Sequence, residues 1–277
     1  MTRKTTHRTQ YTFVFGALAS SLSTVALPGY SALAADLPAF SAEDVFEMEY
    51  ANDPQVSPDG SRVAYVRSSM DIMTDRTRRT IWVVDIDGDN HRPLVSGTGN
   101  FSSPRWSPSG DRLAYLSNTE GKTQVFVQWL DGGETAKVTT LPQSPRSIVW
   151  SPDGKHIAFT RFVPAAPPTL ADMPAKPKGA KWAEPATVVD RMTFRFDGGG
   201  YLPTGSQQVF VVPADGGTPR QMTSGDYPIS GSVSWMPDNQ SIVFSSNRRE
   251  DVEYHPRQND LYAASMTTGE LTQMTDQ

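Results

Sequence analysis

The stretch Ser57-Pro58-Asp59-Gly60-Ser61-Arg62-Val63-Ala64-Tyr65 states a pattern that the chain repeats three more times. The second and third copies are Ser107-Pro108-Ser109-Gly110-Asp111-Arg112-Leu113-Ala114-Tyr115 and Ser151-Pro152-Asp153-Gly154-Lys155-His156-Ile157-Ala158-Phe159, and a looser fourth copy is Met236-Pro237-Asp238-Asn239-Gln240-Ser241-Ile242-Val243-Phe244. The prolines stand at 58, 108, 152 and 237, so the steps between copies are 50, 44 and 85 residues. The last step equals one period plus an insertion of about 40 residues, which indicates a repeated structural unit that is interrupted once.

Each copy predicts a tight turn that leads into a buried strand. Proline sets the second position of a type I turn, and glycine tolerates the geometry that closes it. The apolar, β-branched and aromatic residues that follow suit a strand covered on both faces. Each copy is followed by a second apolar strand, a polar turn and one more short strand; the second strands lie at 81–85, 124–128, 208–212 and 260–264. Four strands per repeat are typical of a β-propeller blade. We therefore expect an all-β fold, a partial β-propeller of four four-stranded blades of the TolB-like or WD-like kind.

The N-terminal residues 1–34 have the features of a cleavable signal peptide. Three basic side chains precede a moderately apolar run at 11–27, and Ala32-Leu33-Ala34 fits a cleavage signal. A membrane anchor is the alternative, although the apolar run is short for a span. We expect a periplasmic or secreted protein that has no membrane contact after cleavage.

Composition limits the classes of partner. The 277 residues contain no cysteine, so an exported form would depend on buried area rather than disulfides. Without residues 1–34, 22 basic against 30 acidic side chains leave a formal charge of −8. An acidic balance of this size gives no electrostatic footprint for nucleic acid.

The chain around the repeats divides into a lead-in and an interrupted propeller. Residues 35–53 are expected to hold a short N-capped helix that ends before Pro54. Residues 54–277 are expected to form the incomplete propeller, and blade three is interrupted by an insertion at 163–206. The first half of this insertion is rich in Pro, Ala and Lys and predicts an extended excursion. Its second half, 190–201, alternates and then turns through glycines, which predicts a hairpin.

Two features beyond the repeat resemble a known family. The repeat alone is shared by TolB-like propellers. The lead-in 42–46 running into 55–60, and the segment Asp190-Arg191-Met192 with 194–198 and Gly200-Tyr201, are similar to the N-terminal propeller of the prolyl oligopeptidase family of serine peptidases, in its acylaminoacyl-peptidase and dipeptidyl-peptidase branch. The resemblance implies an exported peptidase whose propeller covers a C-terminal α/β-hydrolase domain, restricts access to short peptides, and relies on a Ser-Asp-His triad for cleavage.

The chain itself does not contain that chemistry. A hydrolase nucleophile of this kind needs a Gly-x-Ser-x-Gly pentapeptide, and none occurs in the 277 residues. We therefore assign no catalytic residue, no cofactor and no metal. Residues 85–89 carry Asp at alternate positions like a calcium loop, but they lack the required glycine and the acidic twelfth residue, so a hairpin turn explains them better.

The candidate substrate-binding residues are Arg191, Arg195, Asp197 and Tyr201 in the insertion. A guanidinium on a hairpin that leans toward a catalytic face could bind a peptide carboxylate in bidentate fashion. The alternative is an Arg-Asp pair that only holds the hairpin together.

Two functions follow from these features. The first is the substrate-gating propeller of an exported serine peptidase that acts on short peptides, inert by itself because the hydrolase domain is absent from this chain. The alternative is a TolB-like periplasmic propeller that binds a protein partner as an adaptor. The insertion favours the peptidase, and so does the position of residue 277, which falls in the connection to an expected fifth blade.

Overall fold

The computed structural model describes residues 40–172, 174–183 and 186–275. The predicted signal peptide, 1–34, lies outside these residues. In the described part, no helix is both long and apolar enough to cross a bilayer.

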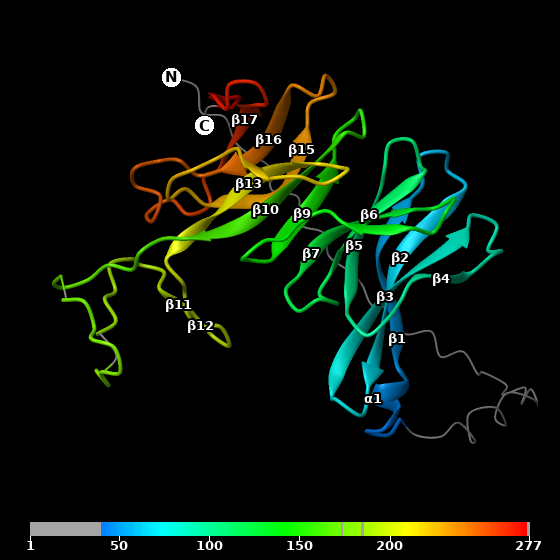
Figure 1. Ribbon diagram of the computed structural model, residues 1–277, viewed down its shortest axis with the longest axis horizontal. Coiled ribbons are helices and arrows are strands. Elements are labelled where there is room, and N and C mark those ends of the chain that lie inside the picture. Colours follow the sequence, from blue (N-terminus) through cyan, green and yellow to red (C-terminus); the bar gives the residue numbers. More distant parts are fainter. Residues whose placement is uncertain (1–39, 173, 184–185, 276–277) are drawn as a thin grey trace, which may run out of the picture. The chain divides into compact units, whose positions relative to one another are not determined.

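Four four-stranded antiparallel sheets follow one another along the chain, as the repeats predict (Figure 1). Blade one contains β1 (Glu49–Val56), β2 (Arg62–Asp71), β3 (Arg76–Asp85) and β4 (Arg92–Val95). Blade two contains β5 (Phe101–Trp106), β6 (Arg112–Ser117), β7 (Gln124–Trp129) and β8 (Thr135–Lys137). Blade three contains β9 (Pro145–Trp150), β10 (His156–Pro164), β13 (Gly205–Pro213) and β14 (Arg220–Gln221), and blade four contains β15 (Ile229–Trp235), β16 (Ser241–Ser246), β17 (Asp260–Ser265) and β18 (Leu271–Gln273).

Two predicted boundaries need correction. The lead-in expected to be a helix within 35–53 holds only α1 (Asp44–Glu47), and Glu49 already belongs to β1. Residues 49–52 pair with 66–69 of β2, and this strand pairing outweighs the weak helical preference of a segment that is too short to be stable alone. The insertion is also shorter than 163–206, because β10 and β13 stay paired up to Pro164 and Gly205. We call residues 165–204 the blade-three insertion.

The repeated phrase forms the turn that was predicted. In blade one, Gly60 N–H donates to Ser57 O over 2.9 Å, and Gly60 has a φ of +74°, which favours glycine. The Ser57 hydroxyl donates to Asp59 at 2.5 Å and accepts from the N–H of Arg62 at 2.9 Å. It therefore links the middle of the turn to the first residue of the strand that follows. Blade two has Ser109 at the Asp59 position, and Asp111 accepts the Ser107 hydroxyl instead, at 2.8 Å. A departure from the repeat is therefore compensated two residues later.

The hydroxyl donors make these turn carboxyls more acidic. Hydrogen bonds from Ser57 and then Ser61 lower the pKa of Asp59 from 3.8 to about 2, and the Ser109 and Ser151 hydroxyls lower the pKa of Asp111 and Asp153. A carboxyl whose pKa is lower in the folded state stabilises the fold above its unfolded pKa. That contribution is lost as the pH falls through the folded pKa.

We expect the thermal unfolding midpoint to fall between about pH 4 and about pH 2, and this fall to be shallower in the triple variant Asp59→Asn, Asp111→Asn, Asp153→Asn. The variant should also melt lower than the parent at about pH 6, where all three carboxylates are ionised. Asp131→Asn, in the turn between β7 and β8, is the control for loss of one surface charge. Parallel pH profiles for parent and triple variant would contradict the expectation.

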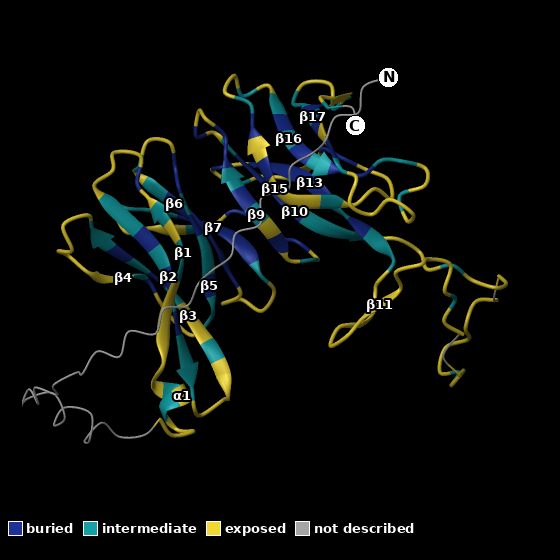
Figure 2. Ribbon diagram, turned by 180° about the vertical axis from the view of Figure 1, so that it is seen from behind, coloured by how far each residue is buried: buried dark blue, intermediate teal, exposed yellow. Residues whose placement is uncertain are grey.

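The apolar core lies between successive blades rather than within one sheet. Figure 2 shows the middle strands β10, β13 and β16 largely buried, whereas most of the blade-three insertion is exposed. Three buried clusters join blades one and two, two and three, and three and four. The small residues predicted at one strand position, Ala64, Ala114 and Ala158, are fully buried in these clusters, where the neighbouring sheet approaches closely.

A tryptophan at the end of the first strand ties each of blades two, three and four to the blade before it. Each indole Nε1–H donates to a backbone carbonyl of the preceding first strand: Trp106 to Gln55 at 2.9 Å, Trp150 to Arg105 at 2.9 Å, and Trp235 to Val149 at 3.3 Å. The first residue of the second strand in the preceding blade lies against the same ring: Arg62 against Trp106, Arg112 against Trp150, and His156 against Trp235. The repeat therefore encodes the contact between blades as well as the strands.

Candidate functional site

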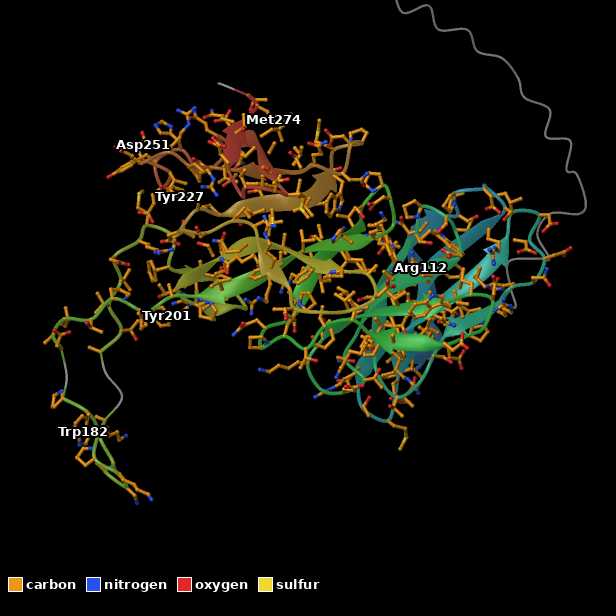
Figure 3. The ribbon with its side chains drawn as sticks, turned by 45° about the horizontal axis from the view of Figure 1, so that its top comes forward. Arg112, Trp182, Tyr201, Tyr227, Asp251 and Met274 are labelled. Carbon is orange, nitrogen blue, oxygen red and sulfur yellow. The ribbon has the colours of Figure 1, made fainter. Side chains whose placement is uncertain are left out.

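The blade-three insertion emerges from the end of blade three where β10 and β13 part. Figure 3 shows Trp182 on the outer part of this insertion and Tyr201 nearer to the sheets. Its second half contains the predicted hairpin in a smaller form, β11 (Arg195–Phe196) paired with β12 (Gly200–Tyr201). The hairpin is extended by one more bond, from the N–H of Leu202 to the carbonyl of Phe194 at 2.8 Å.

One carboxylate anchors this hairpin to the propeller. Asp226, in the connection from blade three to blade four, accepts from the Arg191 guanidinium and from the Ser206 hydroxyl, the latter at 2.6 Å. A second anchor joins the insertion to the loop between β16 and β17, where the N–H of Met192 donates to Glu253 Oε2 at 3.3 Å. The insertion is thus held by two different blades at its hairpin end.

The anchored hairpin and the two blades border an open cavity of about 1200 Å³, which we call the insertion cavity. Blade three contributes Phe162 and Gln207, and blade four contributes Ile229 and the loop residues Val252, Glu253 and Pro256. The insertion supplies aromatic and aliphatic side chains, among them Phe194, Phe196, Tyr201 and Leu202. The lining is therefore largely apolar, with a few charged groups, which is typical of a ligand site.

The structure separates the four predicted substrate-binding residues into two pairs. Arg191 and Tyr201 line the insertion cavity, whereas Arg195 and Asp197 are exposed and lie outside its lining. The Arg191 guanidinium is paired with the Asp226 carboxylate. This contact resembles the alternative stated above, in which an Arg-Asp pair holds the hairpin, although the partner is Asp226 rather than a residue of the hairpin itself.

Sequence reasoning missed the partners that the blades contribute. Asp226 and Glu253 stand in polar connections that give no motif, and Ser206 is the second residue of β13. Asp226 follows Gln221-Met222-Thr223, the closing stretch that returns as Gln273-Met274-Thr275, and its position after that stretch is the only signal available. The loop 250–255 is acidic and mostly exposed, and its Glu253 also borders the cavity.

The polar motif at 85–89 forms the hairpin turn that was predicted. The turn at 85–89 is a hairpin connection in which Gly88 N–H donates to Asp85 O at 2.9 Å and Asp85 N–H donates to Asp89 O at 3.0 Å. Across the described ranges, no group of three or more His, Cys, Asp or Glu is placed to hold a metal ion.

Comparison with known proteins gives two family matches, which are separated by residues 165–180 of the blade-three insertion. Residues 35–164 match the TolB beta propeller domain, and residues 181–277 match the dipeptidyl peptidase IV N-terminal region. The first match ends at the last residue of β10, and the second begins within the insertion, so the hairpin belongs to the peptidase-type match.

The curated relatives that match this chain are named as peptidases. The chain is 31% identical over 213 residues to the uncharacterised peptidase YuxL of Bacillus subtilis (strain 168), which covers 76% of this chain and 31% of that protein. It is 26% identical over 243 residues to dipeptidyl-peptidase 5 of Porphyromonas endodontalis, covering 80% of this chain and 33% of that protein. The chain belongs to the prolyl oligopeptidase family. It carries the propeller portion of such a peptidase, and it spans about a third of the length of the curated relatives it matches.

A solved structure supports the fold of this prolyl oligopeptidase propeller. The acylaminoacyl peptidase of Pyrococcus horikoshii superimposes with a TM-score of 0.61 at 19% identity, covering 83% of this chain and 33% of that one. This superposition shows that the fold is shared. The match to the dipeptidyl peptidase IV N-terminal region begins at residue 181, so it includes the hairpin end of the blade-three insertion, which lines the cavity.

Proposed function

We propose that this chain is the substrate-gating N-terminal propeller of an exported serine peptidase that acts on short peptides. Hydrolysis is carried out by an α/β-hydrolase domain outside these 277 residues. The propeller contributes no catalytic group and acts by limiting which peptides reach the reacting centre.

The observation that carries the proposal is the insertion cavity, a large apolar site built where a blade departs from the four-stranded pattern. Loops that depart from a rigid scaffold are where binding function concentrates. The peptidase relatives support the class of substrate, since the names of two of them specify dipeptidyl or acylaminoacyl substrates. The lack of Gly-x-Ser-x-Gly in the sequence supports a separate catalytic domain.

The adaptor alternative has less support. A TolB-type match covers only residues 35–164, which hold the repeat shared by both classes of protein. The insertion hairpin and blade four fall in the match to a peptidase propeller region. A role as a protein-binding adaptor gives no reason for residues 181–277 to resemble the propeller region of a peptidase.

The gating role is tested in the full-length protein by removing the insertion. Because Pro164 and Gly205 are directly paired, an Asn-Gly turn can replace residues 165–204 and close the hairpin without moving β10 or β13. We expect kcat/KM for peptides of about twelve residues, divided by kcat/KM for tetrapeptides, to rise about tenfold, a change of about 1.4 kcal/mol in discrimination.

The same Asn-Gly turn in place of residues 72–75, between β2 and β3 of blade one, is the matched control and should leave that ratio unchanged. An unchanged ratio in the insertion variant would contradict the gating role, and so would full-length protein that cleaves no peptide at all. Export is tested separately by fusing residues 1–34 to alkaline phosphatase, which is active only outside the cytoplasm. An inactive fusion would contradict the signal peptide.

A further inference from the structure

We propose that the insertion cavity binds an apolar segment of a peptide and discriminates against acidic residues next to that segment. This inference rests on the proposed function and names the class of substrate that the cavity selects. It concerns the chemistry of the site rather than the size of the peptide.

The apolar side chains of the hairpin lack a core of their own. A two-stranded hairpin cannot bury its own side chains, and in this hairpin Phe196 is 59% and Tyr201 is 62% exposed. Both line the cavity together with Phe194 and Leu202, and with Ile229 of blade four. Apolar side chains that gather at a concave site, rather than singly over a surface, mark a place where another apolar group binds.

Two anchors fix the segment that leads into the hairpin to the propeller. Asp226 connects the insertion to β13 through Arg191 and Ser206, and Glu253 connects it to the loop of blade four through the N–H of Met192. The segment that leads into the hairpin is therefore fixed to the blades before a ligand arrives, which lowers the entropy cost of binding. A volume of about 1200 Å³ accommodates several residues of an extended peptide rather than one side chain.

Charge selects among apolar peptides. Among the described residues of the lining, the carboxylates are Asp190, Asp226 and Glu253, and the single guanidinium is that of Arg191. Because Asp226 already pairs with Arg191, Asp190 and Glu253 leave the cavity with an excess of negative charge. A like charge on a ligand near these groups is repelled, more strongly in a partly enclosed site than in water. The arrangement therefore disfavours the carboxylate ligand first considered for Arg191.

The test is isothermal titration of this chain with three capped peptides, Ac-Gly-Phe-Leu-Gly-NH2 and its analogues with Asp or Lys in place of both glycines. Capping both ends leaves the flanking side chains as the only charges. We expect the Asp peptide to bind at least about fivefold more weakly than the Gly peptide, and the Lys peptide to bind at least as well. Phe196→Ser should weaken binding of all three about tenfold, because it removes apolar area from the site.

A matched pair of variants isolates the charge. Glu253→Gln should improve binding of the Asp peptide about threefold and leave the Gly peptide unchanged. Glu250→Gln removes the same charge from the same loop but lies outside the lining, so it should change neither. Circular dichroism checks that each variant is folded, and substitution at these exposed positions leaves the buried clusters intact.

Three results would overturn the inference: no saturable binding of the Gly peptide, equal binding of the Asp and Gly peptides, or the same response from Glu250→Gln as from Glu253→Gln. A dimer in sedimentation that Phe196→Ser abolishes would also overturn it, because a second copy would then cover the hairpin. These results leave the length ratio of the full-length enzyme unaffected. Failure of the inference is therefore distinct from failure of the gating role.

Discussion

Replacing Trp150 by alanine is expected to lower the free energy of unfolding by about 3–5 kcal/mol. The side chain is 6% exposed and packs in the cluster between blades two and three. Its Nε1–H donates to the Arg105 carbonyl at 2.9 Å, and the Arg112 guanidinium lies 5.0 Å from the ring centroid. Alanine removes the ring, the hydrogen bond and the surface that the guanidinium covers, at the place where the first strands of the two blades meet.

Denaturant or thermal unfolding of the purified chain measures this effect. A loss of that size is a large part of the about 5–15 kcal/mol that stabilises an ordinary domain, so the midpoint should fall by about 10 °C or more. Trp150→Phe is the matched control. It keeps most of the apolar area but removes part of the ring and the indole N–H that donates to the Arg105 carbonyl, so we expect a loss of about 1–2 kcal/mol. Equal midpoints for the alanine variant and the parent would show that the indole does not join the blades.

Gly205→Ala is expected to destabilise the chain by about 2–5 kcal/mol. Gly205 begins β13, directly opposite Pro164, at a φ of +132° that side chains rarely adopt. A Cβ at this position would overlap the carbonyl oxygen of Val163 and lie 2.8 Å from the Phe162 ring. Both the backbone angle and the close approach of β10 therefore require glycine where the insertion returns to the blade.

Gly216→Ala separates these two causes. Gly216, in the turn between β13 and β14, also has a positive φ, of +94°, but a Cβ added there would meet no atom within 4 Å beyond its chain neighbours. This variant should lose only the backbone contribution, about 1–2 kcal/mol. Thermal unfolding of both variants, with the parent, makes the comparison. Equal losses of stability in the two variants would show that the close approach of β10 does not contribute to the destabilisation caused by Gly205→Ala.

The strand pattern of the chain was predictable because the residues that determine each blade's turns and strands lie close together in sequence. The turn at Ser57–Gly60, the buried strand after it and the second apolar strand of the repeat depend on turn contacts and apolar alternation between residues that are close in sequence. A pattern read along the sequence therefore predicts them. The compensation in blade two, where Asp111 replaces the acceptor expected at Ser109, is equally local. The lead-in helix is shorter than predicted for the opposite reason, since residues 49–52 are strand only through pairing with residues 66–69.

The candidate site was predictable only in part. The hairpin and two of its four proposed residues, Arg191 and Tyr201, were located by a segment that resembles a family motif. Their partners come from outside the insertion: Asp226 is 35 residues from Arg191, and Glu253 is 61 residues from Met192. Single polar residues in connections carry no period and no turn signature, so no local pattern identifies which of them faces the insertion.

By itself, the sequence determined that the chain forms successive four-stranded blades, that blade three is interrupted, and that no Gly-x-Ser-x-Gly nucleophile is present. Those features follow from short-range turn chemistry and apolar alternation, which repeat four times. Only the tertiary structure decided that Trp106, Trp150 and Trp235 join the blades, and that Asp226 holds the insertion over an apolar cavity. The physical reason is that these contacts join residues far apart in the chain, and their geometry exists only after the sheets have packed together.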